Sequence, residues 1–296
     1  MLRNPTLATV WTLLLASLPP HTASGQQPTP LRVMTYNLRY ASTKQPNSWS
    51  ARRPVARELV RKEAPDVIGT QEGLYAQLKD LSDDLPRYDW IGLGREGGSR
   101  GEFMAVFFRR ERLEPIAFDH FWLSDTPEVV GSATWGHTNR RMVTWVHFLD
   151  RRSGRRFYLI NTHFDHRVPL ARERSAGLLL ERMKALETRD PVIVTGDFNA
   201  AAGDSTAYSL LTASGPLRDA WLEAETKGPA LSTFHGYRTP HPDGRRIDWI
   251  LYHGSVICRS TRVITFAVDG QYPSDHFPVL AELELGSDAI PVSERK

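Results

Sequence analysis

The chain contains a single cysteine, Cys258, among its 296 residues. One thiol excludes a disulfide within the chain. Its position in the apolar, strand-like stretch Val256-Ile257-Cys258 predicts a buried thiol rather than a nucleophile. The sequence also lacks an H-E-x-x-H motif and any pairing of cysteines with histidines. These absences argue against a structural zinc site.

A long basic run, a low-complexity tract and an internal repeat are absent as well. The net charge is only +3, and the pI near 9.0 reflects a slight excess of arginine. This balance favours a solvated, arginine-rich surface over a nucleic-acid-binding groove. Apolar residues make up 41% of the chain and charged residues 24%, which is typical of a soluble globular protein.

The N-terminus has the pattern of a secretory signal peptide. Arg3 precedes an apolar run over Leu7–Leu18, and Ala23-Ser24-Gly25 offers a cleavage site before Gln26. We expect a signal peptide over 1–25, a linker over 26–30, one domain over 31–286 and a tail over 287–296. Export to the periplasm or the medium would follow, with an uncleaved anchor as the alternative. No second apolar stretch suggests a transmembrane segment in the mature chain.

Short β-rich runs alternate with turns from residue 31 onward, and three amphipathic helices interrupt them. The expected strands are Arg32–Tyr36, Val67–Gly69, Glu102–Phe108, Met142–Leu149, Phe157–Thr162, Val192–Thr195, Ile247–Leu251 and Val279–Leu285. The expected helices are Ala51–Glu63, Leu74–Asp83 and Leu170–Glu187. A hairpin with Ser153-Gly154 at its turn is predicted between Leu149 and Phe157. Many strands with few, well separated helices favour stacked sheets covered by helices.

Several of these strands end in, or lead into, an acidic, amide or imidazole side chain. These residues are Asn37, Glu72, His163, Asp197, Asn199, Asp248, Asp275 and His276. Because strand ends of one sheet meet at a common edge, we expect these side chains to share one rim. Buried carboxylates are costly without a cation. Oxygen-rich ligands favour Mg²⁺ or Mn²⁺ over zinc.

Three segments, in this order along the chain, resemble motifs of the endonuclease/exonuclease/phosphatase superfamily, which includes DNase I, sphingomyelinases and deadenylases. They are Met34-Thr35-Tyr36-Asn37, Gly196-Asp197-Phe198-Asn199 and Ser274-Asp275-His276-Phe277-Pro278. The segments over 121–127 and 161–166 resemble a bacterial branch of that superfamily. The resemblance implies an α/β fold, a four-layer α/β/β/α sandwich in a single domain.

The resemblance also implies a role for each matching residue. Glu72 matches the principal metal ligand, with Asn37 beside it, and Asp275 adds negative charge near the metal. Glu102 and His163 match an acidic residue and its catalytic histidine, and the pair would favour a protonated ring. Asp248 and His276 resemble a second carboxylate–histidine pair, and the two histidines are not ranked as acid or base.

Three further residues complete the implied centre. Asp197 resembles the residue that orients or deprotonates the attacking water. Asn199 resembles a residue that grips a phosphate oxygen, and Arg141 aligns with a phosphate-contacting arginine. Asp165 and His166 either shape the pocket or serve only in loop hydrogen bonds. The loop over 137–140 and the segment over 234–237 are candidates for substrate contact, with surface and core roles as their alternatives.

The sequence thus predicts a secreted or periplasmic, metal-dependent phosphoesterase that acts by in-line attack of water. Its substrate would be a sugar phosphate, a lipid head group or another small phosphate ester, and we expect a monomer. A secreted endo- or exonuclease that uses the same centre is the first alternative. The near-neutral net charge offers it little phosphate attraction. A catalytically inactive binding module is the second, and it would require a centre residue to be missing.

Overall fold

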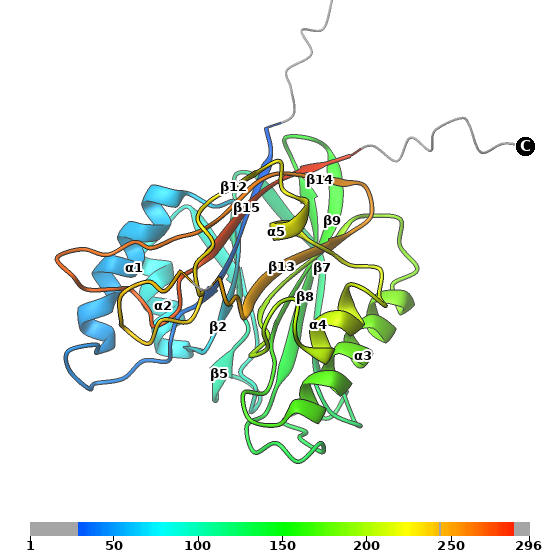
Figure 1. The fold of residues 1–296 in the computed structure, drawn as a ribbon, viewed down its shortest axis with the longest axis horizontal. Helices are drawn as coiled ribbons and strands as arrows, with labels where there is room; N and C mark the ends of the chain where they lie inside the picture. Colours follow the sequence, from blue (N-terminus) through cyan, green and yellow to red (C-terminus); the bar gives the residue numbers. More distant parts are fainter. Residues whose placement is uncertain (1–28, 243, 287–296) are drawn as a thin grey trace, which may run out of the picture.

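Two β-sheets pack face to face in the computed structural model, which describes residues 29–242 and 244–286 (Figure 1). The first sheet has seven strands in the order β12 (Thr226–Lys227), β14 (Val256–Val263), β15 (Val279–Leu285), β1 (Leu31–Asn37), β2 (Val67–Gln71), β6 (Val106–Arg109) and β4 (Tyr88–Ile91). The second has six in the order β11 (Arg218–Asp219), β13 (Asp248–His253), β10 (Val192–Asp197), β9 (Arg155–His163), β8 (Met142–Asp150) and β7 (Leu113–Trp122). A small separate pair joins β3 (Gly73–Leu74) and β5 (Glu102–Phe103).

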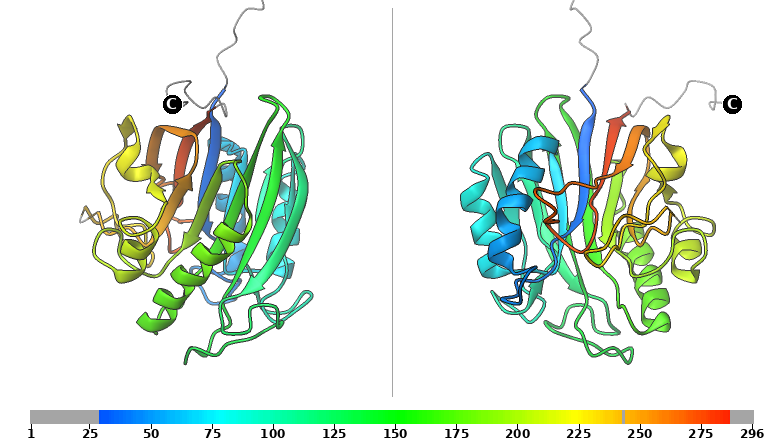
Figure 2. Two further views of the ribbon diagram at one scale, coloured as in Figure 1. Left: turned by 90° about the vertical axis from the view of Figure 1, so that its right-hand side faces the viewer. Right: turned by 60° about the vertical axis from the view of Figure 1, so that its left-hand side comes forward.

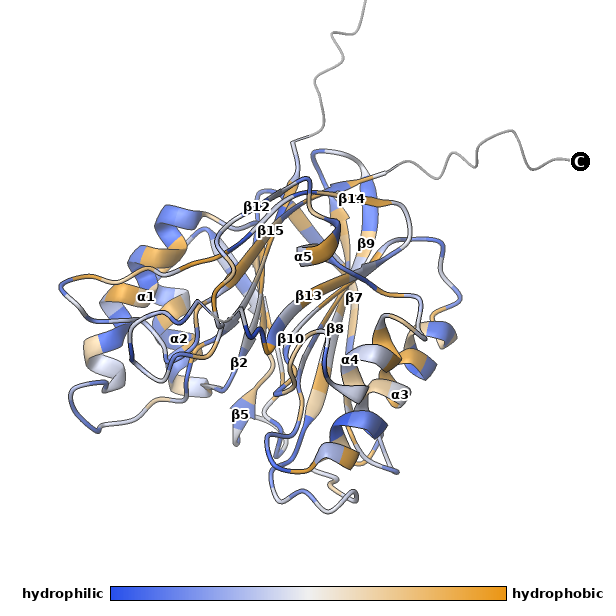
Figure 3. Ribbon diagram, viewed as in Figure 1, coloured by the Kyte–Doolittle hydropathy of each residue, from blue (hydrophilic) through white to orange (hydrophobic). Residues whose placement is uncertain are grey.

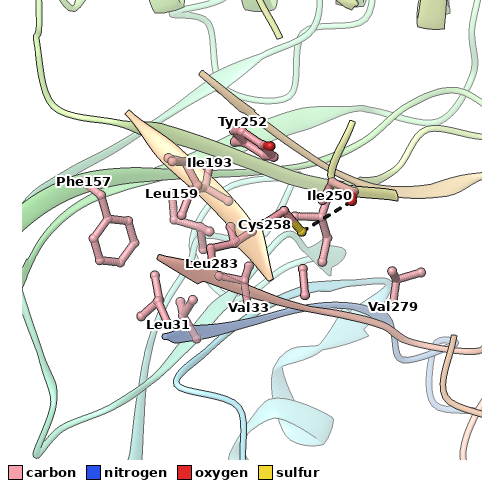
Figure 4. Close-up of a cluster of buried hydrophobic side chains, with 14 of the residues drawn as sticks. Leu31, Val33, Phe157, Leu159, Ile193, Ile250, Tyr252, Cys258, Val279 and Leu283 are labelled. Carbon is pink, nitrogen blue, oxygen red and sulfur yellow. Dashed lines mark hydrogen bonds between the residues drawn. The ribbon is translucent and has the colours of Figure 1, made fainter. Parts of the chain in front are cut away.

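The space between the two sheets is filled by side chains from the inner face of each (Figure 4). Val33 of β1, Leu159 of β9 and Leu283 of β15 are at most 1% exposed there. Cys258 belongs to the same core, and its Sγ lies 3.4 Å from the carbonyl oxygen of Ala220. Burial raises the pKa of this thiol to about 12, so the predicted buried, unreactive cysteine is what the structure contains.

Helices cover the outer face of each sheet (Figures 1 and 2). They are α1 (Trp49–Glu63) and α2 (Tyr75–Asp84) on the seven-stranded sheet, and α3 (Pro169–Ala185) and α4 (Thr206–Leu211) on the six-stranded sheet. A short helix, α5 (Ala220–Glu223), packs between β13 and β14. The layers run α/β/β/α, as the sequence predicted. Figure 3 shows the hydrophobic residues concentrated on the strands, with hydrophilic ones on the outer sides of the helices.

The first helix illustrates why these segments fold where they do. Ser48 accepts a hydrogen bond from the backbone N–H of Ala51, which caps the start of α1. Ala56 and Leu59, three residues apart, are fully buried against the sheet. None of the helices in the described ranges has the length and hydrophobicity needed to cross a lipid bilayer.

One expected strand differs from the structure, and several elements were not expected, among them β4, β7, α4 and α5. The single strand predicted over Glu102–Phe108 is wrong, because β5 pairs with β3 whereas β6 pairs with β2 and β4. Strand β7 escaped prediction because it is an edge strand whose middle residues face solvent, so apolar and polar residues do not alternate along it. The predicted hairpin is present between β8 and β9, with Gly154 at a positive φ of 69°.

The expected signal peptide over 1–25, most of the linker and the tail over 287–296 lie outside the described residues. The expected domain, in contrast, covers nearly all of the described chain. Its boundaries remain predictions.

Strand direction gathers the predicted polar residues at one edge. Strands β9 and β10 are parallel and β13 runs antiparallel to β10, so the register sets Asp197 directly beside His163 on one side and Asp248 on the other. In the facing sheet, Asn37 ends β1 and lies opposite Gln71 at the end of β2. Each sheet therefore delivers part of the site to the same rim.

A close approach of the two sheets holds this rim together. A Cβ atom on Gly69 would lie 2.1 Å from Thr195 Oγ1 and 2.6 Å from Asn161 Oδ1, so only glycine fits between the sheets here. Across the gap, Gln71 Nε2 donates to Asn161 Oδ1 at 2.7 Å. These fully buried contacts fix the spacing between the two halves of the site.

Candidate active site

A pocket of about 640 Å³ opens at the rim. It is lined by Arg39, Tyr40, Glu72, Arg95, Glu102, Asn139, Arg141, His163, His166, Arg167, Asp197, Asn199, Phe234, Ile247, Asp275 and His276. Eight of the ten site residues predicted from the sequence are in this lining. The other two, Asn37 and Asp248, lie directly behind it, because each hydrogen-bonds a residue that faces the pocket. The structure thus brings the whole predicted set together.

Asn37 connects two acidic side chains of the lining. Its Nδ2 lies 3.1 Å from Glu72 Oε1 and 2.9 Å from Asp197 Oδ2. Burial raises the pKa of Glu72. This effect is outweighed by the positive charges of His276 and Arg39 and by the hydrogen bond from Asn37, so the pKa falls below its usual value. Glu72 is therefore an ionised ligand-type carboxylate inside the pocket.

The donor set fits a divalent cation. One ligand atom each from Glu72, His163 and Asp197 lies within 4.8 Å of the others, and Asp197, Asp248 and His276 form a second such group. Two buried carboxylates brought this close repel each other unless a cation or proton intervenes. Asp197 shows this repulsion, because burial and Asp248 raise its pKa. Carboxylate oxygens suit a hard ion.

Asp275 is not a member of either group of possible metal ligands. Its Oδ2 lies 3.6 Å from Arg39 Nε, and the same guanidinium lies 3.8 Å from Glu72 Oε2. Arg39 thus contacts both carboxylates and partly neutralises their charge. Arg39, Glu72 and Asn199 all have positive φ, between 48° and 61°. Such strained backbone is typical of functional sites.

His276 and Asp248 form the carboxylate–histidine pair that the sequence predicted. His276 Nδ1 lies 3.0 and 3.2 Å from the two oxygens of Asp248, and Nε2 lies 3.8 Å from Asp197 Oδ2. Burial opposes protonation of the ring, but Asp248 and Asp197 outweigh it and raise the pKa of His276 to about 10. His276 is a cation held between two acids.

The protonation state of His163 differs from the one expected from the sequence. Asn199 Nδ2 lies 3.0 Å from His163 Nε2 and also donates to the carbonyl oxygen of Phe164. Because the amide nitrogen donates, His163 Nε2 accepts, and the ring hydrogen is placed on Nδ1. This Nδ1 is buried and has no hydrogen-bond partner among the residues that the structure describes. Burial, followed by the charge of Arg141, lowers the pKa of His163 well below its usual value.

The expected pairing of Glu102 with His163 is wrong. Glu102 Oε2 accepts from Arg95 Nη1 at 2.6 Å instead. The cause is local, because Arg95 lies seven residues before Glu102 in the loop between β4 and β5, and its backbone N–H also bonds the Glu102 carbonyl. The protonated ring expected for His163 therefore lacks the carboxylate that would have stabilised it.

Arg141 supplies positive charge on the pocket wall. It is 3% exposed, and its Nη2 lies 3.1 Å from His166 Nδ1. Its Nε is 3.7 Å from Asp165 Oδ2, too long for a hydrogen bond, and Nε and Nη1 have no partner in the described chain. Arg141 is thus a buried guanidinium with unused donors, which is the chemistry of an anion site.

Sequence reasoning missed Arg39, Tyr40 and Arg95. Arg39 and Tyr40 directly follow the Asn37 motif, and their place beside it was the available signal. Arg95 lies in the glycine-rich loop Gly92-Leu93-Gly94-Arg95, where glycines indicate a tight turn but not its direction. Phe234, left open at first, is 50% exposed, and its ring centroid lies 5.0 Å from that of His276. It forms an apolar side of the pocket.

Comparison with known proteins shows which sequences and folds this chain resembles. A sequence profile of the Endonuclease/Exonuclease/phosphatase family matches residues 34–276. A family protein from Bacteroides vulgatus is 35% identical, covering 87% of this chain and 100% of that one, with a TM-score of 0.82. The mannosyl-6-phosphatase of Bacteroides thetaiotaomicron is also 35% identical, covering 86% and 99%, with a TM-score of 0.82.

More distant relatives share less. Protein L388 of Acanthamoeba polyphaga mimivirus is 30% identical over 161 residues, which are 51% of this chain and 59% of the viral protein. The catalytic domain of human nocturnin is 21% identical, covering 87% and 94%, with a TM-score of 0.67. At that identity the likeness concerns the fold alone.

Proposed function

Because the chain belongs to the Endonuclease/Exonuclease/phosphatase family, whose members hydrolyse phosphoric esters, we propose that it is a divalent-metal-dependent phosphomonoesterase for small substrates of the sugar phosphate class. The observation that carries this proposal is that the carboxylates of Glu72 and Asp197 share one pocket with the Arg141 guanidinium, whose Nε and Nη1 have no hydrogen-bond partner in the described chain. A phosphate monoester bears up to two negative charges, which a metal ion and a fixed guanidinium would stabilise together. The 35% identical mannosyl-6-phosphatase supports the substrate class.

Glu72 and Asp197 would hold the ion, with His163 within reach and Asn37 fixing the two carboxylates. A bound Mg²⁺ or Mn²⁺ supplies Lewis-acid neutralisation of the phosphoryl oxygens. Burial and Asp248 raise the pKa of Asp197, whereas a cation bound beside it would favour the ionised form, which can accept a proton. In this proposal Asp197 also accepts the proton of the attacking water.

Arg141 binds phosphoryl oxygens, since it lines the pocket with unused N–H donors. Asn199 also lines the pocket, and it would bind a phosphoryl oxygen by releasing the hydrogen bond that it gives to His163 or Phe164. The water oxygen forms the new bond to phosphorus while the bond to the leaving oxygen breaks on the opposite side. His276, the cation between Asp248 and Asp197, donates its proton to the leaving oxygen. The two products are then inorganic phosphate and a free alcohol. His163, in its neutral form, contributes a hydrogen bond rather than a charge.

A substrate panel tests this function. The mature protein with Mg²⁺ or Mn²⁺ is given mannose 6-phosphate, p-nitrophenyl phosphate, bis-p-nitrophenyl phosphate and supercoiled plasmid. We expect metal-dependent release of phosphate from the two monoesters, and EDTA should abolish it. Faster hydrolysis of the diester, or plasmid nicking at catalytic protein concentrations, would replace the monoesterase with a nuclease. No turnover at all, with no metal bound, would favour a binding module.

Export is a further part of the proposal. It is supported by the basic residue, apolar run and small-residue site within the first 25 residues. Expression of the full chain should yield a periplasmic or secreted protein whose first residue is Gln26, as read by mass spectrometry. An intact N-terminus on protein retained in the cytoplasm would contradict this.

A further inference from the structure

An ion pair on the pocket wall has no part in the mechanism above. Arg95 and Glu102 are joined at 2.6 Å, and their side chains are 13% and 16% exposed. The pair is held rigidly, because Arg95 and Glu102 also share a backbone hydrogen bond of 2.9 Å and Trp122 Nε1 donates to the Arg95 carbonyl at 2.7 Å. Both side chains line the pocket.

The fold has little need of this pair. It joins two residues of one loop that backbone hydrogen bonds already close, including Arg95 to Glu102 and Glu96 to Arg100. A largely buried ion pair contributes little net stability, because both charges lose their water. The pair adds no long-range connection that would offset this cost, which suggests that its role concerns the pocket.

Each partner keeps polar atoms unused. Arg95 Nε is buried, and neither Nε nor Nη2 of Arg95 has a hydrogen-bond acceptor in the described chain. Glu102 Oε2 binds Arg95, and no described residue donates to Oε1. A donor and an acceptor are thus fixed side by side. Asn139 also lines this pocket, and the next residue, Arg140, has its Nη1 3.9 Å from Oε1 of Glu96 in the loop of Arg95.

The charges of the pair indicate what it binds. A second anion on the substrate would be repelled by Glu102, and a cation would be repelled by Arg95. A hydroxyl group suits both, because it donates to a carboxylate and accepts from a guanidinium. We propose that Arg95 and Glu102 form a hydroxyl-recognition subsite for the polyol part of a phosphate ester. This proposal rests on the proposed function and assigns Glu102 to the leaving group rather than to His163.

The experiment compares two substrates that differ only in hydroxyl groups. Mannose 6-phosphate carries ring hydroxyls, whereas (tetrahydropyran-2-yl)methyl phosphate keeps the six-membered ring with its oxygen and the primary phosphate ester but lacks the hydroxyls. The measured quantity is the ratio of the two kcat/KM values, in wild type, Glu102→Gln and Arg95→Met. Because both substrates are cleaved by the same folded enzyme, the ratio cancels any loss of folded protein.

We expect wild type to prefer mannose 6-phosphate and each variant to lower that preference at least about tenfold, as for loss of a charged hydrogen bond. Glu96→Gln, on the same loop but exposed and outside the pocket lining, is the matched control and should keep the wild-type ratio. A preference retained in both variants, or equal losses on both substrates, overturns the subsite and leaves the phosphomonoesterase standing. A wild type without preference for the sugar overturns the sugar phosphate assignment as well.

Discussion

Asn37 and Asp197 are 160 positions apart in the chain, yet Asn37 Nδ2 lies 2.9 Å from Asp197 Oδ2. The same nitrogen reaches Glu72 Oε1 at 3.1 Å. One neutral amide therefore holds two carboxylates, from opposite sheets, at the separation that a single cation can bridge.

Removing the amide should weaken metal binding. Asn37→Ala is expected to lower Mn²⁺ affinity about 10–100-fold, as for loss of a residue that orients metal ligands. Glu72→Gln should lower it further, because a ligand charge is lost. Isothermal titration with Mn²⁺ measures both. Glu181→Gln, exposed on α3, is the control, and wild-type affinity in Glu72→Gln would show that the ion lies elsewhere.

The Asp248–His276 pair should be essential for turnover. Asp248→Asn removes the carboxylate that keeps His276 protonated, so kcat should fall about 10²–10⁴-fold. His276→Ala and Asp197→Ala should likewise remove activity while circular dichroism stays unchanged. Asp190→Asn offers a matched control, because Asp190 holds His147 at 2.8 Å outside the pocket. A wild-type rate in Asp248→Asn would exclude His276 as the proton donor.

Arg141 should dominate phosphate affinity. Arg141→Ala removes a buried guanidinium with two unused donors, so competitive inhibition by inorganic phosphate should weaken about 10–100-fold. The measurement is the inhibition constant against p-nitrophenyl phosphate. The neighbouring Arg140 is exposed and outside the pocket lining, so Arg140→Ala should keep the wild-type constant. Equal constants in wild type and Arg141→Ala would place the anion elsewhere.

Arg52 is a fully buried cation whose hydrogen bonds should be important for stability. Its five N–H groups donate to the carbonyl oxygens of Leu38, Arg39, Tyr40, Asn47 and Pro273. Lysine has only three donors, so Arg52→Lys leaves at least two carbonyls without a donor. The free energy of unfolding should fall by at least about 2 kcal/mol, measured by urea denaturation.

A surface substitution on the same helix provides the comparison for Arg52. Arg53 forms partly exposed ion pairs with Asp80 and Asp84, so Arg53→Lys should change the free energy of unfolding by less than about 1 kcal/mol. Equal stability of the two lysine variants would mean that the carbonyl cluster around Arg52 is easily satisfied by other groups.

His235 should make the fold sensitive to acid. Its ring stacks on Phe277 at 3.8 Å, and burial lowers its pKa to about 4 from 6.5. Above pH 6.5 the ring is neutral in both states. Between pH 6.5 and 4 the unfolded chain takes up a proton that the folded chain refuses, so stability falls as the pH falls. The difference in pKa corresponds to about 3 kcal/mol, and partial access of solvent to the ring reduces the expected loss to roughly 2 kcal/mol.

Urea denaturation at several pH values measures this loss. The stability advantage of wild type over His235→Gln should shrink as the pH is lowered from 7.5 to 4.5. The exposed His253, replaced by glutamine, serves as the control for the loss of a histidine that is not buried. A pH-independent difference for His235→Gln would show that this ring does not resist protonation in the fold.

The sequence alone was sufficient to predict where the strands end, and hence most of the residues of the pocket. Asp197 and His276 lie in short motifs next to buried strands, and the ends of neighbouring strands lie along one side of a sheet. The same local signal failed for Glu102, because its partner depends on how the preceding glycine-rich loop turns. It also gave no indication of Arg52, whose burial is set by Leu38 and by Pro273, 221 positions away.

The sequence by itself therefore determined the layers, the family and the groups that meet at the rim. These features can be read from hydrophobic periodicity and from short motifs, each of which involves only residues close together in the sequence. Tertiary structure alone decided which acid faces which base. Glu102 meets Arg95, His276 meets two acids, and His163 is left neutral beside Arg141. The reason is physical: charge and proton affinity depend on burial and on distances of a few ångströms between residues far apart in the sequence, which no local pattern records.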